Sequence, residues 1–262
     1  MPDVETTTSG RIRVVTINRP ERRNAVDGPT AALLAGAFRS FDEDDDVDVA
    51  VLTGAGGVFC AGADLKSVAE GRGNRVDKEG DGPMGPTRLR LGKPVIAAIE
   101  GIAVAGGLEL AAWCDLRVAG EHAVFGVFCR RFGVPLVDLG TIRLPRLIGQ
   151  SRALDLILTG RGVVAPEAHS MGLVNRVVPD GEALAASLEL AGSLVALPQR
   201  CLRHDRASVL EQWDLAEPDA ILNEVDHGLE VIRSGETLDG AARFASGAGR
   251  GGTPRSRTVS EH

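Results

Sequence analysis

Two short segments rich in glycine and small residues carry backbone groups that could do chemistry, VFCAGADLK at 58–66 and VAGGLEL at 104–110. Each falls between a strand-like and a helix-like run, where N–H groups that lack a helical partner can face a ligand. Gly62 allows a turn that points the amide of Ala63 into a cleft. Gly106 opens a helix whose dipole favours negative charge. A pair of such amides would form an oxyanion hole, although similar turns also occur where only tight packing is needed.

The segments that must position these turns alternate between two patterns. Strand-like runs stand at 11–18, 48–53, 93–101 and 115–126, and each is followed by a helix-like stretch. This rhythm predicts an α/β fold. From about Ala183 onward, apolar residues recur at helical spacing, which predicts a helical C-terminal part.

The composition is that of a soluble globular protein. The chain has 262 residues, of which 44% are hydrophobic and 25% charged, and no apolar run is long enough to cross a bilayer. The formal net charge of −7 disfavours a general nucleic-acid surface. The first residues are acidic and polar, unlike a signal or transit peptide, so we expect a cytoplasmic protein.

Cysteine and histidine side chains show no metal-ligand or disulfide spacing. We therefore expect reduced thiols and no metal site. These residues are Cys60, Cys114, Cys129, Cys201, His122, His169, His204, His227 and His262.

The segment 70–87 is rich in glycine and charged residues. It has too few apolar residues to anchor it, which predicts a mobile loop that could gate a pocket.

Several blocks of the sequence resemble the crotonase superfamily, also called the enoyl-CoA hydratase/isomerase family. They are NRPERRNAV at 18–26, LTGAGGVFCAGADLK at 52–66 and KPVIAAIEGIAVAGGLELAAWCD at 93–115. The similarity continues through 125–149 and 157–179, and more loosely through the C-terminal helices, so it covers nearly the whole chain.

The resemblance implies a spiral of ββα turns over residues 1–182, which would bind acyl-CoA, and a helical region over 183–262 that makes trimers, often paired as hexamers. It implies coenzyme A as part of the substrate and no prosthetic group. The oxyanion amides would be those of Ala63 and Gly106, the positions that the backbone pattern also indicates.

Residues expected to contact coenzyme A also follow from the resemblance. Arg23 and Lys66 match positions at the nucleotide end of the ligand, although both could simply be surface charges. Further positions in the family pattern are Ala61, Asp64, Phe244 and Arg250, the last two near the ligand of a neighbouring subunit.

Two glutamates deliver water across the double bond in hydratases of this family. Glu109 matches the first, and a carboxylate that faces a partly apolar pocket has the raised pKa that suits proton transfer. Its alternative role is a charge that favours the helix dipole. Cys129 stands where the second glutamate is expected, and a thiol is a poor substitute for a carboxylate in this task. A small packed apolar residue is the favoured interpretation of Cys129 over a nucleophile.

Asp138 is a possible substitute, because dienoyl-CoA isomerases of the superfamily place an aspartate before a similar Gly-Thr step. Together with Glu109 it could move a proton between two carbons and shift a double bond. Its alternative role is to cap the following turn. Arg130 and Arg131 could neutralise Asp138 or recognise a carboxylate on the substrate.

The sequence thus predicts an acyl-CoA enzyme that stabilises a thioester enolate, and hydration of a 2-enoyl-CoA is the reaction that it favours. Enoyl-CoA or dienoyl-CoA isomerisation is the close alternative, since it can proceed with Glu109 alone or with Asp138. A non-catalytic acyl-CoA-binding protein is the third.

Overall fold

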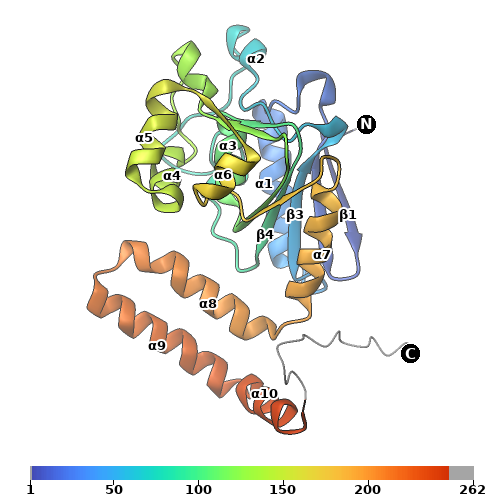
Figure 1. Cartoon of the computed structure of the whole chain (residues 1–262), viewed down its shortest axis with the longest axis vertical. Helices are drawn as coiled ribbons and strands as arrows, with labels where there is room; N and C mark the ends of the chain where they lie inside the picture. Colours follow the sequence, from blue (N-terminus) through green and yellow to red (C-terminus); the bar gives the residue numbers. More distant parts are fainter. Residues whose placement is uncertain (1, 248–262) are drawn as a thin grey trace.

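Two β-sheets form the centre of the computed structural model, which describes residues 2–247 (Figure 1). The larger sheet has the strand order β1-β2-β3-β4-β6-β9, with β1 antiparallel to β2 and the other pairs parallel. The smaller sheet has the order β5-β7-β8. The strands are β1 (Val4–Ser9), β2 (Ile12–Ile17), β3 (Val49–Gly54), β4 (Val95–Ile99), β5 (Ile102–Val104), β6 (Leu116–Gly120), β7 (Val124–Gly126), β8 (Gly162–Val164) and β9 (Arg176–Val178).

Helices follow most of the strands, as the alternating pattern predicts. They are α1 (Gly28–Glu43), α2 (Leu65–Ala69), α3 (Gly106–Trp113), α4 (Gly140–Ile148), α5 (Gln150–Thr159), α6 (Ala165–Ser170), α7 (Ala183–Val195), α8 (Gln199–Glu211), α9 (Glu217–Arg233) and α10 (Glu236–Ala245). Short 3-10 turns are η1 (Pro20–Arg22), η2 (Ala55–Gly57), η3 (Pro86–Arg88), η4 (Phe128–Phe132) and η5 (Gln212–Asp214). The predicted α/β fold with a helical C-terminal region is confirmed.

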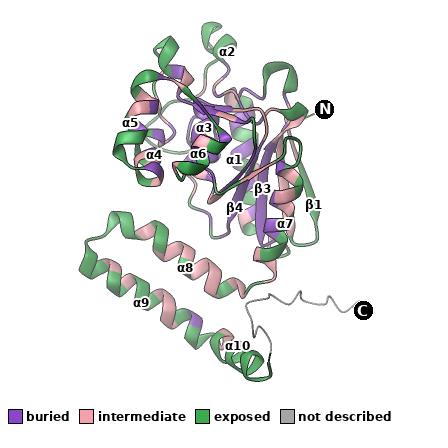
Figure 2. Ribbon diagram, in the orientation of Figure 1, coloured by how far each residue is buried: buried purple, intermediate pink, exposed green. Residues whose placement is uncertain are grey.

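The central strands are buried on both faces, which explains their continuous apolar sequences. Ala50 and Leu52 of β3 face the larger core, which α1 and α3 help to close. Val49 and Val51, which alternate with them, face a smaller core closed by α7. Figure 2 shows β3 and β4 in the colour of buried residues, so the turns that follow these strands start from a well-packed sheet.

The helices α8, α9 and α10 stand away from this body (Figure 1). Val231 is the one buried residue in these three helices, and large apolar side chains are exposed along them. Exposed apolar surface of this kind is typical of protein contact sites. The exposed side chains include Val209, Leu210, Ile221, Leu222, Val225, Ile232, Leu238 and Phe244.

The segment expected to be a mobile loop is only partly unanchored. Residues 70–81 are mostly exposed, but 82–87 are buried, with Met84 at 1% and Thr87 at 0% exposure. The prediction is therefore wrong for 82–87. One buried methionine and hydrogen bonds to Asp138 fix this stretch, and neither is visible in a count of apolar residues.

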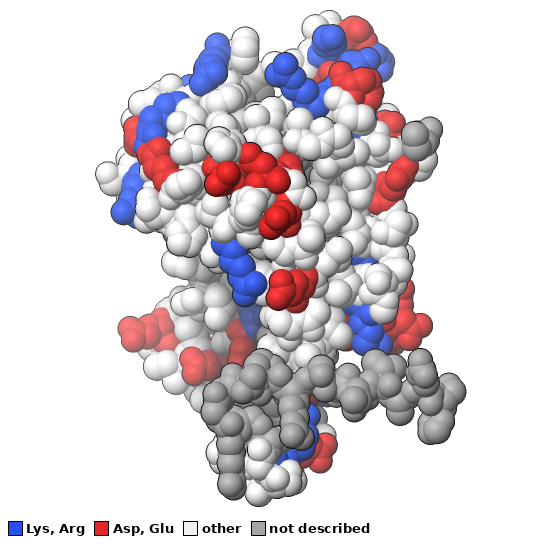
Figure 3. All heavy atoms as spheres, turned by 45° about the vertical axis from the view of Figure 1, so that its right-hand side comes forward, with Lys and Arg blue, Asp and Glu red and all other residues white. Residues whose placement is uncertain are grey.

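Charges on the surface are mixed in sign. On the face shown in Figure 3, basic side chains do not gather into one broad patch. No helix within residues 2–247 combines the length and the apolar character needed to span a membrane.

Candidate active site

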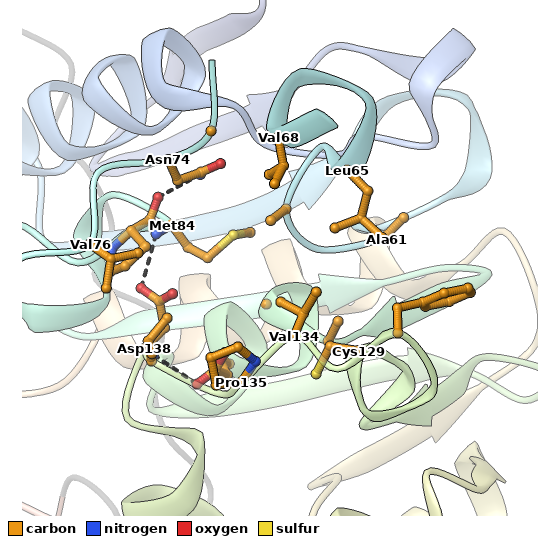
Figure 4. Close-up of a pocket in the computed structure, with 18 of the residues that line it drawn as sticks. Ala61, Leu65, Val68, Asn74, Val76, Met84, Cys129, Val134, Pro135 and Asp138 are labelled. Atoms are coloured by element: carbon orange, nitrogen blue, oxygen red, sulfur yellow. Dashed lines mark hydrogen bonds between the residues drawn. The ribbon is translucent and has the colours of Figure 1, made fainter. Parts of the chain in front are cut away.

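A cavity of about 300 Å³ lies between two segments of the chain, 61–84 and 128–138. Figure 4 shows Ala61, Leu65 and Val68 on one wall, with Cys129, Val134 and Pro135 opposite. Most lining side chains are apolar, and Glu109 and Asp138 are the two charged ones. This is the arrangement of a ligand pocket with a few placed polar groups.

Two backbone amides meet at the inner wall of this pocket. Gly62 has φ +96°, and a Cβ added there would lie 3.0 Å from the amide nitrogen of Gly106, so the two turns approach closely. Ala105, just before α3, has φ 55° and ψ −126°, a strained conformation for a residue with a side chain. Among the described residues, neither the Ala63 nor the Gly106 amide donates a hydrogen bond within the chain. Both amides are therefore available to an oxygen in the pocket.

The first of these turns is fixed by the strand-like bridge between Val26 and Ala63. The amide of Val26 donates to the carbonyl of Gly62 (2.8 Å), and the amide of Asp64 donates to the carbonyl of Val26 (2.9 Å). The peptide groups before and after Ala63 are therefore both hydrogen-bonded to Val26, and the fold sets the direction of the Ala63 N–H.

Asp64 is buried and caps α2, where its carboxylate accepts from the amides of Lys66 and Ser67. Arg19 and Arg22 form ion pairs with the same carboxylate, at 3.3 and 3.2 Å. Burial opposes its ionisation, but the Ser67 amide and the two arginines outweigh burial and lower its pKa. The structure thus gives the side chain of Asp64 an anchoring role.

The other residues predicted to contact coenzyme A occupy two regions. Ala61 lines the pocket and donates its amide to the carbonyl of Arg23 (3.1 Å), while the side chains of Arg23 and Lys66 are exposed. Phe244 lies on α10 with 62% of its surface exposed. Arg250 lies outside the described residues.

Glu109 projects from the first turn of α3 into the pocket and is only 2% exposed. Its Oε1 atom accepts hydrogen bonds from the amides of Asp138 (2.9 Å) and Gly140 (2.8 Å). Its Oε2 atom has no hydrogen-bond partner in residues 2–247. Burial, followed by the nearby charge of Asp138, raises the pKa of Glu109 to about 7. A carboxyl group of this kind can both take up and release a proton near neutral pH.

Cys129 lies in η4 and lines the same pocket, at 7% exposure. Burial, and then the charge of Glu109, raises the pKa of its thiol. A protonated, packed thiol fits the interpretation of Cys129 as a small apolar residue of the wall.

Asp138 also lines the pocket, but its contacts differ from those that the sequence predicts. Its Oδ1 atom accepts from the amide of Met84 (2.9 Å) and from the Thr87 hydroxyl. It does not cap α4, which begins after Leu139 without a side-chain cap, so that alternative is wrong.

The prediction that Arg130 or Arg131 neutralises Asp138 is also wrong. They donate instead to the carbonyls of Ile157 (3.1 Å) and Gly160 (2.9 Å). The arginine that hydrogen-bonds to the backbone of Asp138 is Arg143 of α4, which donates to the Asp138 carbonyl at 3.2 Å. Arg143 was not predicted, because nothing in the spacing of one helix shows which arginine reaches the carbonyl of Asp138.

One group of side chains in residues 2–247 has ligand atoms close enough to hold a metal ion, within 4.8 Å of one another. It consists of Glu121, His122 and Asp180, all exposed. His122 Nδ1 lies 2.7 Å from Asp180 Oδ2, so these two ligand atoms are already hydrogen-bonded to each other. This group could not be predicted from residue spacing, because Asp180 is 58 residues from His122.

Comparison with known proteins agrees with this geometry. Residues 7–246 match the family model described as enoyl-CoA hydratase/isomerase. The chain is 38% identical to enoyl-CoA hydratase EchA19 of Mycobacterium tuberculosis, over 93% of this chain and 94% of that protein. It is 37% identical to mevalonyl-coenzyme A hydratase SIDH of Beauveria bassiana, over 86% of this chain and 85% of that protein.

Solved structures give the same result. The crystal structure of an enoyl-CoA hydratase from Mycobacterium tuberculosis superposes with a TM-score of 0.88 at 37% identity, covering 94% of this chain and 96% of that one. The fold and the match define the class, a crotonase-type protein, and confirm the resemblance seen in the sequence. The chain belongs to the enoyl-CoA hydratase/isomerase family.

Proposed function

We propose that the protein is an acyl-CoA enzyme that hydrates a 2-enoyl-CoA, with Glu109 as its acid and base. The observation that carries this proposal is the state of the Glu109 carboxyl group. One oxygen accepts from two backbone amides, and the other has no hydrogen-bond partner within residues 2–247. The pKa of the group is about 7. Such a group can orient a water molecule, take its proton, and return a proton to the α-carbon.

The thioester oxygen would lie between the amides of Ala63 and Gly106. When water adds to the β-carbon, negative charge develops on this oxygen, and two prepositioned N–H groups stabilise it. One such donor typically lowers a barrier by about 3–4 kcal/mol. The apolar walls of the pocket strengthen these hydrogen bonds because they exclude water.

Isomerisation of a double bond is the second candidate, and Cys129 favours it. The thiol replaces the carboxylate that would share the work of holding water, and its raised pKa keeps it protonated. A double-bond shift needs one group that removes a proton and returns it elsewhere, and Glu109 alone satisfies this need.

Coenzyme A binding and assembly complete the proposal. Arg23, Ala61 and Lys66 would contact the ligand from the chain that holds the pocket, and Phe244 would contact the ligand of a neighbour. The exposed apolar faces of α8, α9 and α10 support a homotrimer, with pairing into a hexamer as an extension. No prosthetic group is required for this chemistry. The cytoplasmic location inferred from the sequence stays a prediction.

The decisive experiment follows crotonyl-CoA by proton NMR in deuterated water, with wild type, Glu109→Gln and Cys129→Glu. A matched control is Glu100→Gln. Glu100 also accepts from two backbone amides through one oxygen, at 3.0 and 2.9 Å, but does not line the pocket.

Formation of 3-hydroxybutyryl-CoA by the wild type and by Glu100→Gln, with loss in Glu109→Gln, establishes the hydratase. Gain of hydration only in Cys129→Glu assigns the native reaction to isomerisation, which 3-enoyl-CoA and dienoyl-CoA substrates then test. Binding of acyl-CoA by the wild type without hydration, isomerisation or deuterium exchange overturns both and supports a binding protein.

A further inference from the structure

Asp138 joins two parts of the site that are far apart in the sequence. We infer that Asp138 is a positioning residue, which holds residues 82–87 against the oxyanion turn at 105–106 and orients Glu109, and that it transfers no proton itself. This inference rests on the proposed role of Glu109.

The first link runs through the side chain of Asp138. Its Oδ1 atom accepts from the Met84 amide, a contact drawn in Figure 4, and from the Thr87 hydroxyl, so both donors converge on one oxygen of a buried residue. Gly82 packs so closely against this pair that a Cβ added to it would overlap the Thr87 hydroxyl. The turn at 82–87 is therefore shaped around the Asp138 carboxylate.

Met84 carries this contact to the oxyanion turn. Its side chain is 1% exposed and lies against the start of α3, where a Cβ added to Gly106 would be 2.6 Å from the Met84 sulfur. The thioether thus fills the space beside the Gly106 amide. If the 82–87 turn moved, the wall next to this amide would open.

The second link runs through the backbone. The amide of Asp138 donates to Glu109 Oε1, so the residue that anchors Met84 also fixes the catalytic carboxylate. Arg143 of α4 also connects the two segments, because it donates to the carbonyls of Asp138 (3.2 Å) and Thr87 (2.7 Å).

Charge couples the same groups. The negative charge of Asp138 contributes, after burial, to the raised pKa of Glu109. Burial raises the pKa of Asp138 above its usual value, although the Thr87 and Met84 donors and the charges of Arg88 and Arg143 oppose this effect. The Oδ1 atom of Asp138 thus accepts from two protein donors, and this geometry carries the positioning role.

Because Asp138 also lines the pocket, the test must separate support from contact with substrate. Asp138→Asn removes the charge but keeps an oxygen that can accept from Met84. Asp138→Ala removes both. We expect kcat to fall by no more than about tenfold in the first and by about a hundredfold in the second, as the turn shifts.

The proton affinity of Glu109 gives an independent readout. Carbon NMR of protein labelled at the glutamate carboxyl carbons identifies Glu109 as the resonance lost in Glu109→Gln. Its titration midpoint should move to lower pH in Asp138→Asn, because a like charge is removed. This measurement does not require turnover.

Thr87 provides a second route, since it touches Asp138 but does not line the pocket. Thr87→Val removes the donor, and Thr87→Ser should recover most of the kcat that the valine loses. Thr53→Val is the matched control, because Thr53 is also buried but donates to Ala98 on the sheet.

Asp138→Asn as inactive as Glu109→Gln, or an unmoved Glu109 midpoint, would overturn the positioning role. Full activity of Glu109→Gln would instead overturn the proposed function, so the two failures are distinct.

Discussion

The carboxylate of Glu109 lies against the backbone of Gly140 at the start of α4. The Gly140 amide donates to Glu109 Oε1 at 2.8 Å, and a Cβ added to Gly140 would lie only 2.7 Å from the same oxygen. The absence of a side chain at Gly140 is thus a condition for the observed position of the carboxylate.

Gly140→Ala should displace Glu109 without unfolding the protein. Alanine suits the first turn of a helix, and the end of the glutamate side chain can move, so the melting temperature should change little. The carboxylate would lose its alignment, and kcat should fall by about tenfold to a hundredfold. Gly36→Ala in α1 is the control, because a Cβ there meets nothing within 4 Å. Equal kcat values in the two variants would argue against the importance of this alignment.

Gly62→Ala should displace the turn that presents the Ala63 amide to the pocket. The φ of +96° strains any other residue, and the new Cβ would lie 2.9 Å from Ala105 Cβ and 3.0 Å from the Gly106 nitrogen. Displacing one amide should reduce kcat by at least about a hundredfold.

Gly10→Ala separates backbone strain from loss of the amide, because Gly10 also has a positive φ, of +54°, but open space around it. Both variants should have lower melting temperatures, and only Gly62→Ala should lose activity. A comparable loss of kcat in Gly10→Ala would point to general instability.

The raised pKa of Glu109 should make the wild type less stable as pH rises. The native state holds its proton up to about pH 7, whereas the unfolded chain releases it near the ordinary value of 4.5. Stability from this group is therefore complete below about pH 4.5 and is lost as pH rises through 7. The loss amounts to about 3 kcal/mol per chain.

Urea unfolding at pH 5 and pH 8, at one protein concentration, measures this effect. The free energy of unfolding of the wild type should fall between these pH values relative to that of Glu109→Gln, which cannot titrate at this position. Parallel pH dependence in the two proteins would show that Glu109 titrates normally.

The sequence predicted the parts of the site that depend on local geometry. Ala63 and Gly106 follow from glycine-rich turns between a strand and a helix, where backbone rules place an amide, whereas Glu109 was identified through the resemblance to the family. The strands and helices were predictable for the same reason, since their apolar periods are local. Roles in the reaction remain predictions for these residues.

The contacts of Asp138 were not predictable in this way. Met84 and Thr87 are 54 and 51 residues from it, and only the three-dimensional fold brings these groups together. The local pattern suggested that Asp138 caps the following turn, but its side chain accepts hydrogen bonds from Met84 and Thr87 instead. The same contact explains why 82–87 is buried although its sequence is typical of a loop.

Leu222→Glu should break the proposed homotrimer. Leu222 is 64% exposed on α9, and its neighbours Ile221 and Val225 are 56% and 53% exposed, so a protein contact on this face would bury the new charge. A buried, unpaired carboxylate is costly, and light scattering should show monomers. Leu33→Glu on α1, at 49% exposure, is the control that should leave assembly intact.

Since Phe244 is proposed to contact the ligand of a neighbour, the monomer should also show a raised KM for acyl-CoA with a smaller change in kcat. An unchanged trimer with an unchanged KM would place the subunit contact elsewhere.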